Sequence, residues 1–297
     1  MNVLTLKNVS KTFGDFYAVN DLSFSIASGT MYGLLGPNGA GKTTTIRMIM
    51  DIIVPDQGEI EILGRRNSSF VRDRIGYLPE ERGLYRKMRV GELLLFFSQT
   101  KGMKKADARE KIDFWLEHLD LSEWKDKKVE ELSRGMQQKL QFITTVFHEP
   151  ELIILDEPFT GLDPVNVNLL KEIMLELQKN GVTVILSTHL MDQVEKLCNS
   201  ICLLHQGKKV LEGPLAHIKK QVGRNSIALA YEGTARFLRD ARLINRFDNY
   251  GNYVEVHPAE GVDPQEILHR AVQEVTVSRF EIVEPSLNEI FIQTVQR

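Results

Sequence analysis

Short apolar runs separated by polar residues dominate both the first 35 residues and the stretch after residue 150. Residues 21–26 (DLSFSI) alternate with period two, and residues 31–35 (MYGLL) run into a glycine-rich loop. Two later runs, LIIL at 152–155 and VTVIL at 182–186, are almost continuously apolar. Because a strand that is apolar at successive positions is buried on both faces, we expect a central sheet covered on both sides.

Helical spacing of apolar residues appears in three other places. It follows the glycine-rich loop at 43–53 (TTTIRMIMDII), it dominates from about 90 to 147, and it returns over about 164–180. The order of strand, glycine-rich loop and helix is the context that a phosphate-binding loop requires. The whole pattern predicts an α/β fold with a helical subdomain at about 90–147.

The pattern changes near Gly213 and Pro214, where the segments become too short to continue the main sheet. We therefore expect two domains, at residues 1–221 and 222–297, the second a small α/β domain. His257 and His269 stand singly in the second domain, so solvent-exposed or packing roles are expected for them and not metal ligation.

Composition adds few constraints, because 42% of residues are hydrophobic and the formal net charge is −3. A broad nucleic-acid footprint would need a basic excess, so no nucleic-acid partner is expected. The start lacks the pattern of a signal peptide, and the apolar run Leu93–Phe97 is far below the ~20 residues of a membrane span. We expect a soluble chain. Cys198 and Cys202, with no further cysteine nearby, are expected to be buried small hydrophobes.

The glycine-rich segment GPNGAGKT fits G-x-x-x-x-G-K-[ST]. Its glycines allow successive backbone N–H groups to face a phosphate, and the next helix presents its positive N-terminal end to the same anion. The lysine would reach the β- and γ-phosphates, and the threonine hydroxyl would bind Mg²⁺. By itself the loop leaves kinases, GTPases and transport ATPases open. Its residues are Gly36, Pro37, Asn38, Gly39, Ala40, Gly41, Lys42, Thr43 and the adjoining Thr44.

Two carboxylates, Asp156 and Glu157, end the apolar strand at 152–155. Phosphoryl transfer needs an acidic residue near Mg²⁺ and another group to orient or deprotonate the attacking water. We assign these roles to Asp156 and Glu157 respectively. Without the phosphate loop, a helix N-cap after a buried strand would be the favoured explanation of the pair.

Four further segments resemble the nucleotide-binding subunit of an ATP-binding cassette (ABC) transporter, in family order and spacing over about residues 3–220. LSRGMQQK at 132–139 is similar to the family signature, and GLDP at 161–164 to the D-loop. Ser187-Thr188-His189 matches the switch-histidine loop, and Phe13 stands where the family stacks an aromatic ring on adenine. The resemblance implies a P-loop NTPase (RecA-like) core, an N-terminal antiparallel β subdomain and a helical subdomain.

The resemblance also implies an ATPase that works as a dimer. Two copies sandwich two ATP molecules, and Ser133 and Gly135 of one copy bind the γ-phosphate held by the other. Ser133 stands at a helix start, where a hydroxyl and N–H groups can bind an anion. His189 would contact the γ-phosphate and the attacking water, and because Glu157 and His189 are both intact, both sites should be active.

Two positions depart from the family pattern. Glu80 stands where most members carry a glutamine that contacts Mg²⁺; its carboxylate still offers an oxygen to the metal but adds negative charge near a polyphosphate. In the signature, Arg134 and Met136 replace commoner residues. Arg134 either places a positive charge near the γ-phosphate across the dimer interface or faces solvent.

Transport requires a separate membrane permease, because the chain has no predicted span; the family receives a short permease helix in a groove of the helical subdomain. We expect the chain to lie in the cytoplasm, peripheral at the inner face of the cell membrane. The helical-subdomain tryptophans, Trp115 and Trp124, are expected to be core residues. Residues 222–297 resemble the appended domain of bacterial exporters of the sodium-extrusion and daunorubicin-resistance type, which suggests a dimer-stabilising or regulatory role.

Rival interpretations fit less well. A soluble cassette protein acting on ribosomes or DNA usually carries two cassettes or a long coiled-coil insertion, and neither is visible. A P-loop kinase would not explain the signature or His189. A non-hydrolysing switch protein conflicts with the intact Glu157.

Overall fold

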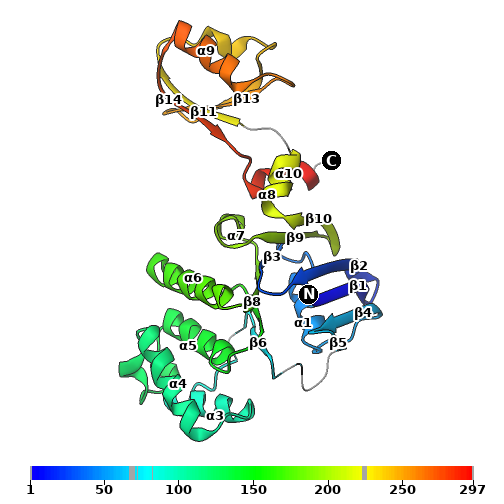
Figure 1. Ribbon diagram of the computed structural model, residues 1–297, viewed down its shortest axis with the longest axis vertical. Coiled ribbons are helices and arrows are strands. Elements are labelled where there is room, and N and C mark those ends of the chain that lie inside the picture. Colours follow the sequence, from blue (N-terminus) through cyan, green and yellow to red (C-terminus); the bar gives the residue numbers. More distant parts are fainter. Residues whose placement is uncertain (1, 67–70, 72, 82, 223–225, 296–297) are drawn as a thin grey trace. The chain divides into compact units, whose positions relative to one another are not determined.

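The computed structural model describes residues 2–66, 71, 73–81, 83–222 and 226–295, and Figure 1 shows its elements. The chain divides into two compact units, Met1–Leu215 and Ala216–Arg297. The division falls a few residues before the boundary expected at 221/222, because helix α8 (Leu215–Val222) lies almost wholly in the second unit.

A six-stranded sheet forms the centre of the first unit, in the order β10-β9-β3-β8-β7-β6. All neighbouring strands are parallel except β10, which pairs antiparallel with β9. Every residue of β3, β7 and β8 is buried, which confirms the expected central sheet. The strands are β3 (Met31–Leu35), β6 (Ile75–Leu78), β7 (Leu152–Asp156), β8 (Thr183–Thr188), β9 (Ser200–His205) and β10 (Lys208–Pro214).

The N-terminal strands form a separate antiparallel sheet, in the order β2-β1-β4-β5. Leu4 and Leu22 of this sheet belong to the same apolar cluster as Ile154 and Ile185 of the central sheet, so the two sheets share a core. Helix α1 contributes Ile46 to the same cluster. The elements are β1 (Asn2–Phe13), β2 (Phe16–Ala27), β4 (Gln57–Ile62), β5 (Arg65–Arg66) and α1 (Lys42–Ile49).

Residues 90–146 form the predicted helical region. Helix α5 begins where the sequence places a capping residue, because the Ser133 hydroxyl accepts a hydrogen bond from the backbone N–H of Met136. The expectation that Trp115 and Trp124 are core residues is wrong: both are only half-buried. The elements are α3 (Val90–Thr100), α4 (Lys105–His118), the 3₁₀ turns η1 (Ser122–Trp124) and η2 (Val129–Glu131), and α5 (Arg134–Val146).

Two helices flank β8 along the chain. Helix α6 (Pro164–Lys179) precedes it, close to the expected 164–180, and begins with Asp163 as N-cap and a proline in its first turn. Helix α7 (Met191–Leu197) follows it and leads into β9. Cys198 and Cys202 are free and buried, which confirms the expectation for them.

The second unit contains a four-stranded antiparallel sheet, in the order β12-β13-β11-β14. Helix α9 packs Ile267 and Ala271 against Leu229 and Val256 of this sheet, so the expected small α/β domain is confirmed. His257 contacts Asp248 at 3.2 Å, whereas His269 is exposed. The remaining elements are β11 (Ser226–Glu232), η3 (Arg236–Arg239), β12 (Ile244–Asn249), β13 (Val254–Pro258), α9 (Pro264–Glu274), β14 (Thr276–Val283) and α10 (Leu287–Val295).

The helices in the described part of the chain were compared with the length and apolar character of a membrane span. None of them is both long enough and apolar enough to cross a bilayer.

Candidate functional site

The loop between β3 and α1 can form only with glycine at two of its positions. Gly36 has φ +151°, and a Cβ there would lie 2.3 Å from the carbonyl oxygen of Leu204. Gly41 has φ +103°, and a Cβ there would lie 2.4 Å from the carbonyl oxygen of Ala18. A side chain at either position would therefore displace backbone, and the loop keeps its N–H groups accessible instead.

Lys42 is the first residue of α1 and is 6% exposed. Its Nζ donates hydrogen bonds to the carbonyl oxygens of Gly36, at 2.8 Å, and Pro37, at 3.2 Å. Burial lowers the pKa of this ammonium group, and the carboxylates of Glu157 and Asp156 oppose that effect. The lysine is thus held over the loop by carbonyl groups that an anionic ligand can replace.

Asp156 ends β7 and is fully buried. The Ser187 hydroxyl of β8 donates to its Oδ1 at 2.7 Å, whereas its Oδ2 has no hydrogen-bond partner among the residues that the structure describes. Burial raises the pKa of Asp156, and the hydroxyls of Ser187 and, to a lesser extent, Thr43 oppose the rise. A buried carboxylate oxygen without a partner is costly, and a cation would satisfy it.

Glu157 follows Asp156 in the left-handed backbone region, with φ +49°. This conformation turns its side chain toward the end of β8, where three donors meet it. The Thr188 hydroxyl donates to Oε2 at 2.9 Å, and the backbone N–H of His189 donates to Oε1 at 3.1 Å. His189 Nδ1 lies 2.8 Å from Oε1. Because a carboxylate only accepts, Nδ1 carries the hydrogen, and Nε2 is left for another partner.

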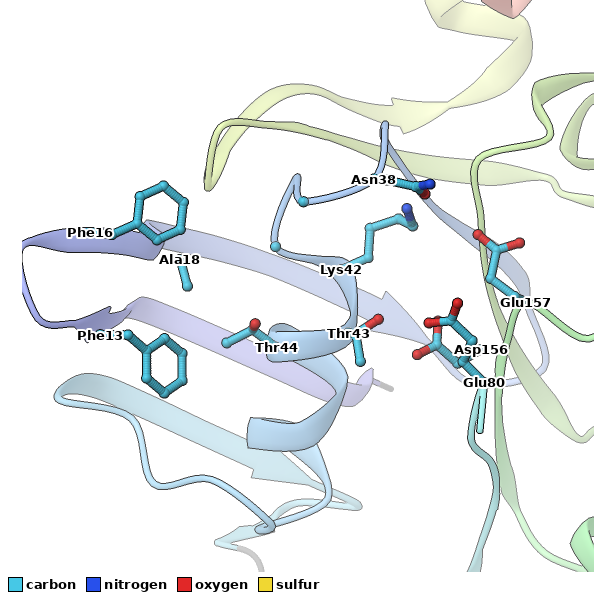
Figure 2. A pocket seen from close by; sticks show the side chains of 12 residues that line it. Phe13, Phe16, Ala18, Asn38, Lys42, Thr43, Thr44, Glu80, Asp156 and Glu157 are labelled. Atoms are coloured by element: carbon cyan, nitrogen blue, oxygen red, sulfur yellow. The ribbon is translucent and has the colours of Figure 1, made fainter. Parts of the chain in front are cut away.

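A cavity of about 400 Å³ joins these groups. Figure 2 shows two phenylalanine rings at one end, three carboxylates at the other, and Lys42 with two threonines between them. The lining residues are Phe13, Phe16, Ala18, Asn38, Gly39, Gly41, Lys42, Thr43, Thr44, Glu80, Asp156 and Glu157. The order from apolar rings through backbone amides to carboxylates suits a ligand with a flat ring and a polyphosphate chain.

Phe16 lines the cavity as Phe13 does, and sequence reasoning missed it. The two residues are direct cross-strand partners across the two-residue turn that joins β1 to β2. Direct partners in an antiparallel pair project to the same face, so both rings, 52% and 60% exposed, lie at the same end of the cavity. The signal was the spacing F-G-D-F, which places a glycine in a two-residue hairpin turn.

A cluster of polar groups, formed by Lys11, Thr12 and Asp56, lies beside Phe13 and fixes its position. The Lys11 ammonium lies 5.7 Å from the Phe13 ring centroid and 2.7 Å from an Asp56 carboxylate oxygen. The backbone N–H and hydroxyl of Thr12 also donate to Asp56. These contacts, chiefly the hydrogen bond from Lys11, lower the pKa of Asp56 to about 2. One face of the ring therefore has a fixed neighbour.

Not all of the sequence-predicted residues line the cavity. Ser133 and Gly135 do not; Ser133 is exposed at the start of α5. His189 reaches the site through Glu157, and Gly36, Pro37 and Ala40 complete the loop without lining the cavity. Exposed Arg134 faces solvent in the single chain.

The interior of α5 is nevertheless tied to the site. Gln138 donates to the carbonyl of Pro158, just after Glu157, at 3.1 Å. Gln141 donates to the carbonyls of Pro79 and Glu81, on either side of Glu80, at 3.2 and 3.4 Å. The helix that begins at the signature thus contacts both carboxylate-bearing loops.

A magnesium ion fits the donors present. Within the described ranges, no group of three or more acidic, cysteine or histidine side chains is arranged to hold a metal alone. Mg²⁺ is usually held by one or two carboxylates together with substrate phosphates, so a complete protein cage is not required. The unpartnered Oδ2 of Asp156, with the Thr43 hydroxyl and Glu80 lining the same cavity, provides oxygen donors of the right kind.

Comparison with protein families gives two matches, which together span most of the chain. Residues 19–160 match the model described as "ABC transporter". Residues 213–295 match the model described as "ATP-binding protein DrrA1-3-like, C-terminal domain".

Related proteins agree with these matches. The chain is 44% identical, over 99% of its length and 98% of the relative's, to an uncharacterized ABC transporter ATP-binding protein of Bacillus subtilis. It is 42% identical to a Nod factor export ATP-binding protein I of a Rhizobium species, over 74% of each chain.

Solved structures give the same result. The structure of an ATP-binding subunit of an ABC transporter superposes with a TM-score of 0.70 at 32% identity, over 74% of this chain and 93% of the other. The ADP conformation of an ATP-binding cassette superposes with a TM-score of 0.62 at 26% identity, over 72% and 91% respectively. With the phosphate loop, buried carboxylates and ring-lined cavity described above, this similarity shows that the chain belongs to the family of ATP-binding subunits of ABC transporters, which are ATPases.

Proposed function

We propose that this ATPase is the energy-supplying subunit of an exporter, acting as a homodimer with a separate membrane permease. The observation that carries the proposal is that Lys42, Asp156 and Glu157 line one cavity whose far end carries aromatic rings. His189 is joined to this group through its contact with Glu157. A catalytic apparatus of this completeness supports hydrolysis and not nucleotide binding alone.

Phosphate binding rests on the loop amides and on Lys42. We infer that a β- or γ-phosphate replaces the carbonyl groups of Gly36 and Pro37 as partners of the lysine ammonium. The N-terminal end of α1 adds its positive dipole. Preorganised donors in a partly buried site stabilise the charge that develops during phosphoryl transfer.

Thr43, Asp156 and Glu80 would hold Mg²⁺, which when bound neutralises phosphate charge and orients the terminal phosphate. Glu157 would accept a proton from the attacking water or orient it, because its carboxylate is already held at the cavity edge by Thr188 and His189. His189 Nε2 would contact the terminal phosphate and the same water.

A second copy would complete the site. Ser133 and Gly135 lie outside the cavity, on the exposed start of α5, where backbone N–H groups and a hydroxyl can bind an anion. We assign them to the terminal phosphate bound by the partner copy. Arg134, exposed beside them, would then carry its charge toward that phosphate.

The permease partner would dock on the helical region. Tyr85 and Phe96 are 53% and 41% exposed and pack edge to face, 5.6 Å apart, close in sequence to Glu80. Gln141 links that segment to α5, so a helix seated there can sense the site. The chain would therefore work at the inner face of the cell membrane, with no nucleic acid as partner. The export direction is supported by the relatives named for Nod factor export.

Glu157→Gln tests hydrolysis and the partner together. We expect ATP to bind and the hydrolysis rate to fall at least about 100-fold, because the group that handles the attacking water loses its charge. Glu172→Gln, an exposed change on α6, should leave the rate unchanged. Membranes solubilised gently with ATP should yield a stoichiometric multi-span protein with tagged Glu157→Gln. Recovery with ribosomes or DNA instead would favour the soluble-cassette alternative.

Glu80→Gln tests the unusual carboxylate. Removing one negative charge from the cavity should leave hydrolysis measurable and make ATP affinity depend less on Mg²⁺. Titrating ATP with and without Mg²⁺, by calorimetry, measures this dependence. An unchanged ratio of the two affinities would contradict a role for Glu80 in binding the metal.

Phe16→Ala tests the second aromatic ring of the cavity. Base stacking on an aromatic side chain is worth about 1–3 kcal/mol, so the Kd for ATP should rise at least about fivefold. The control is Tyr17→Ala, since Tyr17 is the next residue of β2, is 52% exposed and does not line the cavity. Equal affinities for the two variants would remove Phe16 from the site.

Deleting residues 216–297 tests the second unit, which we propose stabilises or regulates the dimer. In the Glu157→Gln background, sedimentation with ATP should show weaker dimerisation of the truncated chain. The first unit keeps its own core, so its thermal unfolding should stay cooperative. Unchanged dimerisation together with unchanged ATPase activity of the truncated wild-type chain would exclude this role.

A further inference from the structure

A second cavity, of about 380 Å³, lies between α4 and α6 and shares no lining residue with the nucleotide cavity. Figure 1 shows α4, α5 and α6 in the same helical layer of the first unit. One wall carries rings from α4, and the facing wall carries aliphatic side chains such as Ile173 and Leu177 of α6. A cavity of this size and apolar character is typical of small-molecule sites.

The ring wall is formed by three side chains of α4. Phe114 and His118, one turn apart, stack with centroids 5.5 Å apart and an interplanar angle of 13°. Trp115 meets both edge to face, at 5.5 and 6.0 Å. Phe114 is 57% exposed, so the fold gains little by burying it. The rings therefore present open faces to a ligand.

The rim of this cavity is acidic on balance. Lys111 and Glu149 form an ion pair at 2.7 Å, which neutralises both charges. Glu176 of α6 also lines the cavity, and its carboxylate has no ion-pair partner in the ranges that the structure describes. Aromatic faces attract cations through the ring quadrupole. The rings and the free carboxylate therefore favour the same kind of ligand, one that is flat, apolar and positively charged.

We propose that this second cavity binds a small planar aromatic cation, with its ring system against Phe114 and Trp115 and its charge toward Glu176. Such a ligand would bridge the helical region to α6, the helix that follows the D-loop. The proposal does not depend on nucleotide hydrolysis, and binding alone tests it.

The probes are 9-aminoacridine, a planar cation at neutral pH, and acridine-9-carboxylate, which has the same ring system and a negative charge. The chain has two tryptophans, of which Trp115 lines the cavity and Trp124 does not. The cationic probe should quench tryptophan fluorescence of the full-length protein. The quenching should be lost in Trp115→Phe and kept in Trp124→Phe.

Calorimetry with matched variants locates the probe. Phe114→Ala and Glu176→Gln should each raise the Kd of 9-aminoacridine roughly fivefold or more, since one removes a ring face and the other a charge. Phe96→Ala, another exposed phenylalanine, and Glu172→Gln, one turn away on α6, should leave it unchanged. Binding should also persist in Phe13→Ala/Phe16→Ala, which removes the rings of the nucleotide cavity.

Three results would overturn the proposal. The first is equal affinity for both acridines, and the second is a Kd of 9-aminoacridine that stays unchanged in Phe114→Ala and in Glu176→Gln. The third is loss of binding in the Phe13→Ala/Phe16→Ala variant. The first would show apolar adsorption without charge recognition. The second would place the probe elsewhere on the chain, and the third would place it in the nucleotide cavity.

Discussion

The parallel register of β3, β8 and β7 determines where the chemistry of this protein occurs. Leu35 pairs with Thr188, and Asp156 pairs with Ser187, so the three strands end at one level of the sheet. The residues that follow them open the phosphate loop, carry the histidine and supply Glu157. Because all three strands are buried on both faces, a shift in register would displace their side chains from close-packed neighbours on both sides of the sheet, and packing therefore holds the alignment. Ligands of open α/β sheets bind at this edge for the same geometric reason.

Charge is concentrated at that edge before any ligand arrives. Lys42, Asp156 and Glu157 are nearly inaccessible, and a buried charge is costly unless other groups satisfy it. Loop carbonyls hold the lysine, a serine hydroxyl holds the aspartate, and Thr188 and His189 hold the glutamate. A bound nucleotide would exchange partners with these groups without rebuilding the site. Among the described residues, Oδ2 of Asp156 has no hydrogen-bond partner, so this carboxylate is satisfied on one oxygen only.

Helix α5 connects that edge to the rest of the first unit. Its start is exposed and capped by Ser133, while Gln138 and Gln141 reach the loops beside Glu157 and Glu80. A ligand or second copy that contacts the exposed start of this helix therefore acts on an element hydrogen-bonded to both carboxylate-bearing loops. The cavity between α4 and α6 is a second place where the helical region lies next to a helix that connects strands of the central sheet.

The sequence by itself determined the elements whose chemistry is local. Gly36 and Gly41 occupy backbone positions that exclude a side chain, Ser133 begins a helix, and the apolar runs at 152–155 and 182–186 favoured buried strands. Such requirements act on a residue and its immediate neighbours, so they leave a readable pattern. The fold class and the loop that would bind phosphate follow from them.

Tertiary structure alone decided the features that depend on residues distant in sequence. The F-G-D-F spacing indicates that Phe13 and Phe16 are paired, but only the packing of their hairpin beside α1 places both rings on the same cavity as Thr43 and Thr44. Trp115 is apolar and at helical spacing, which favours a core position, yet it lines a cavity because α4 and α6 do not close upon it. The division near Leu215 similarly depends on which unit α8 joins. The periodicity of a segment shows which of its faces is buried but not which other segment covers that face, which is why the sequence indicated the nucleotide loop and not the space between two helices.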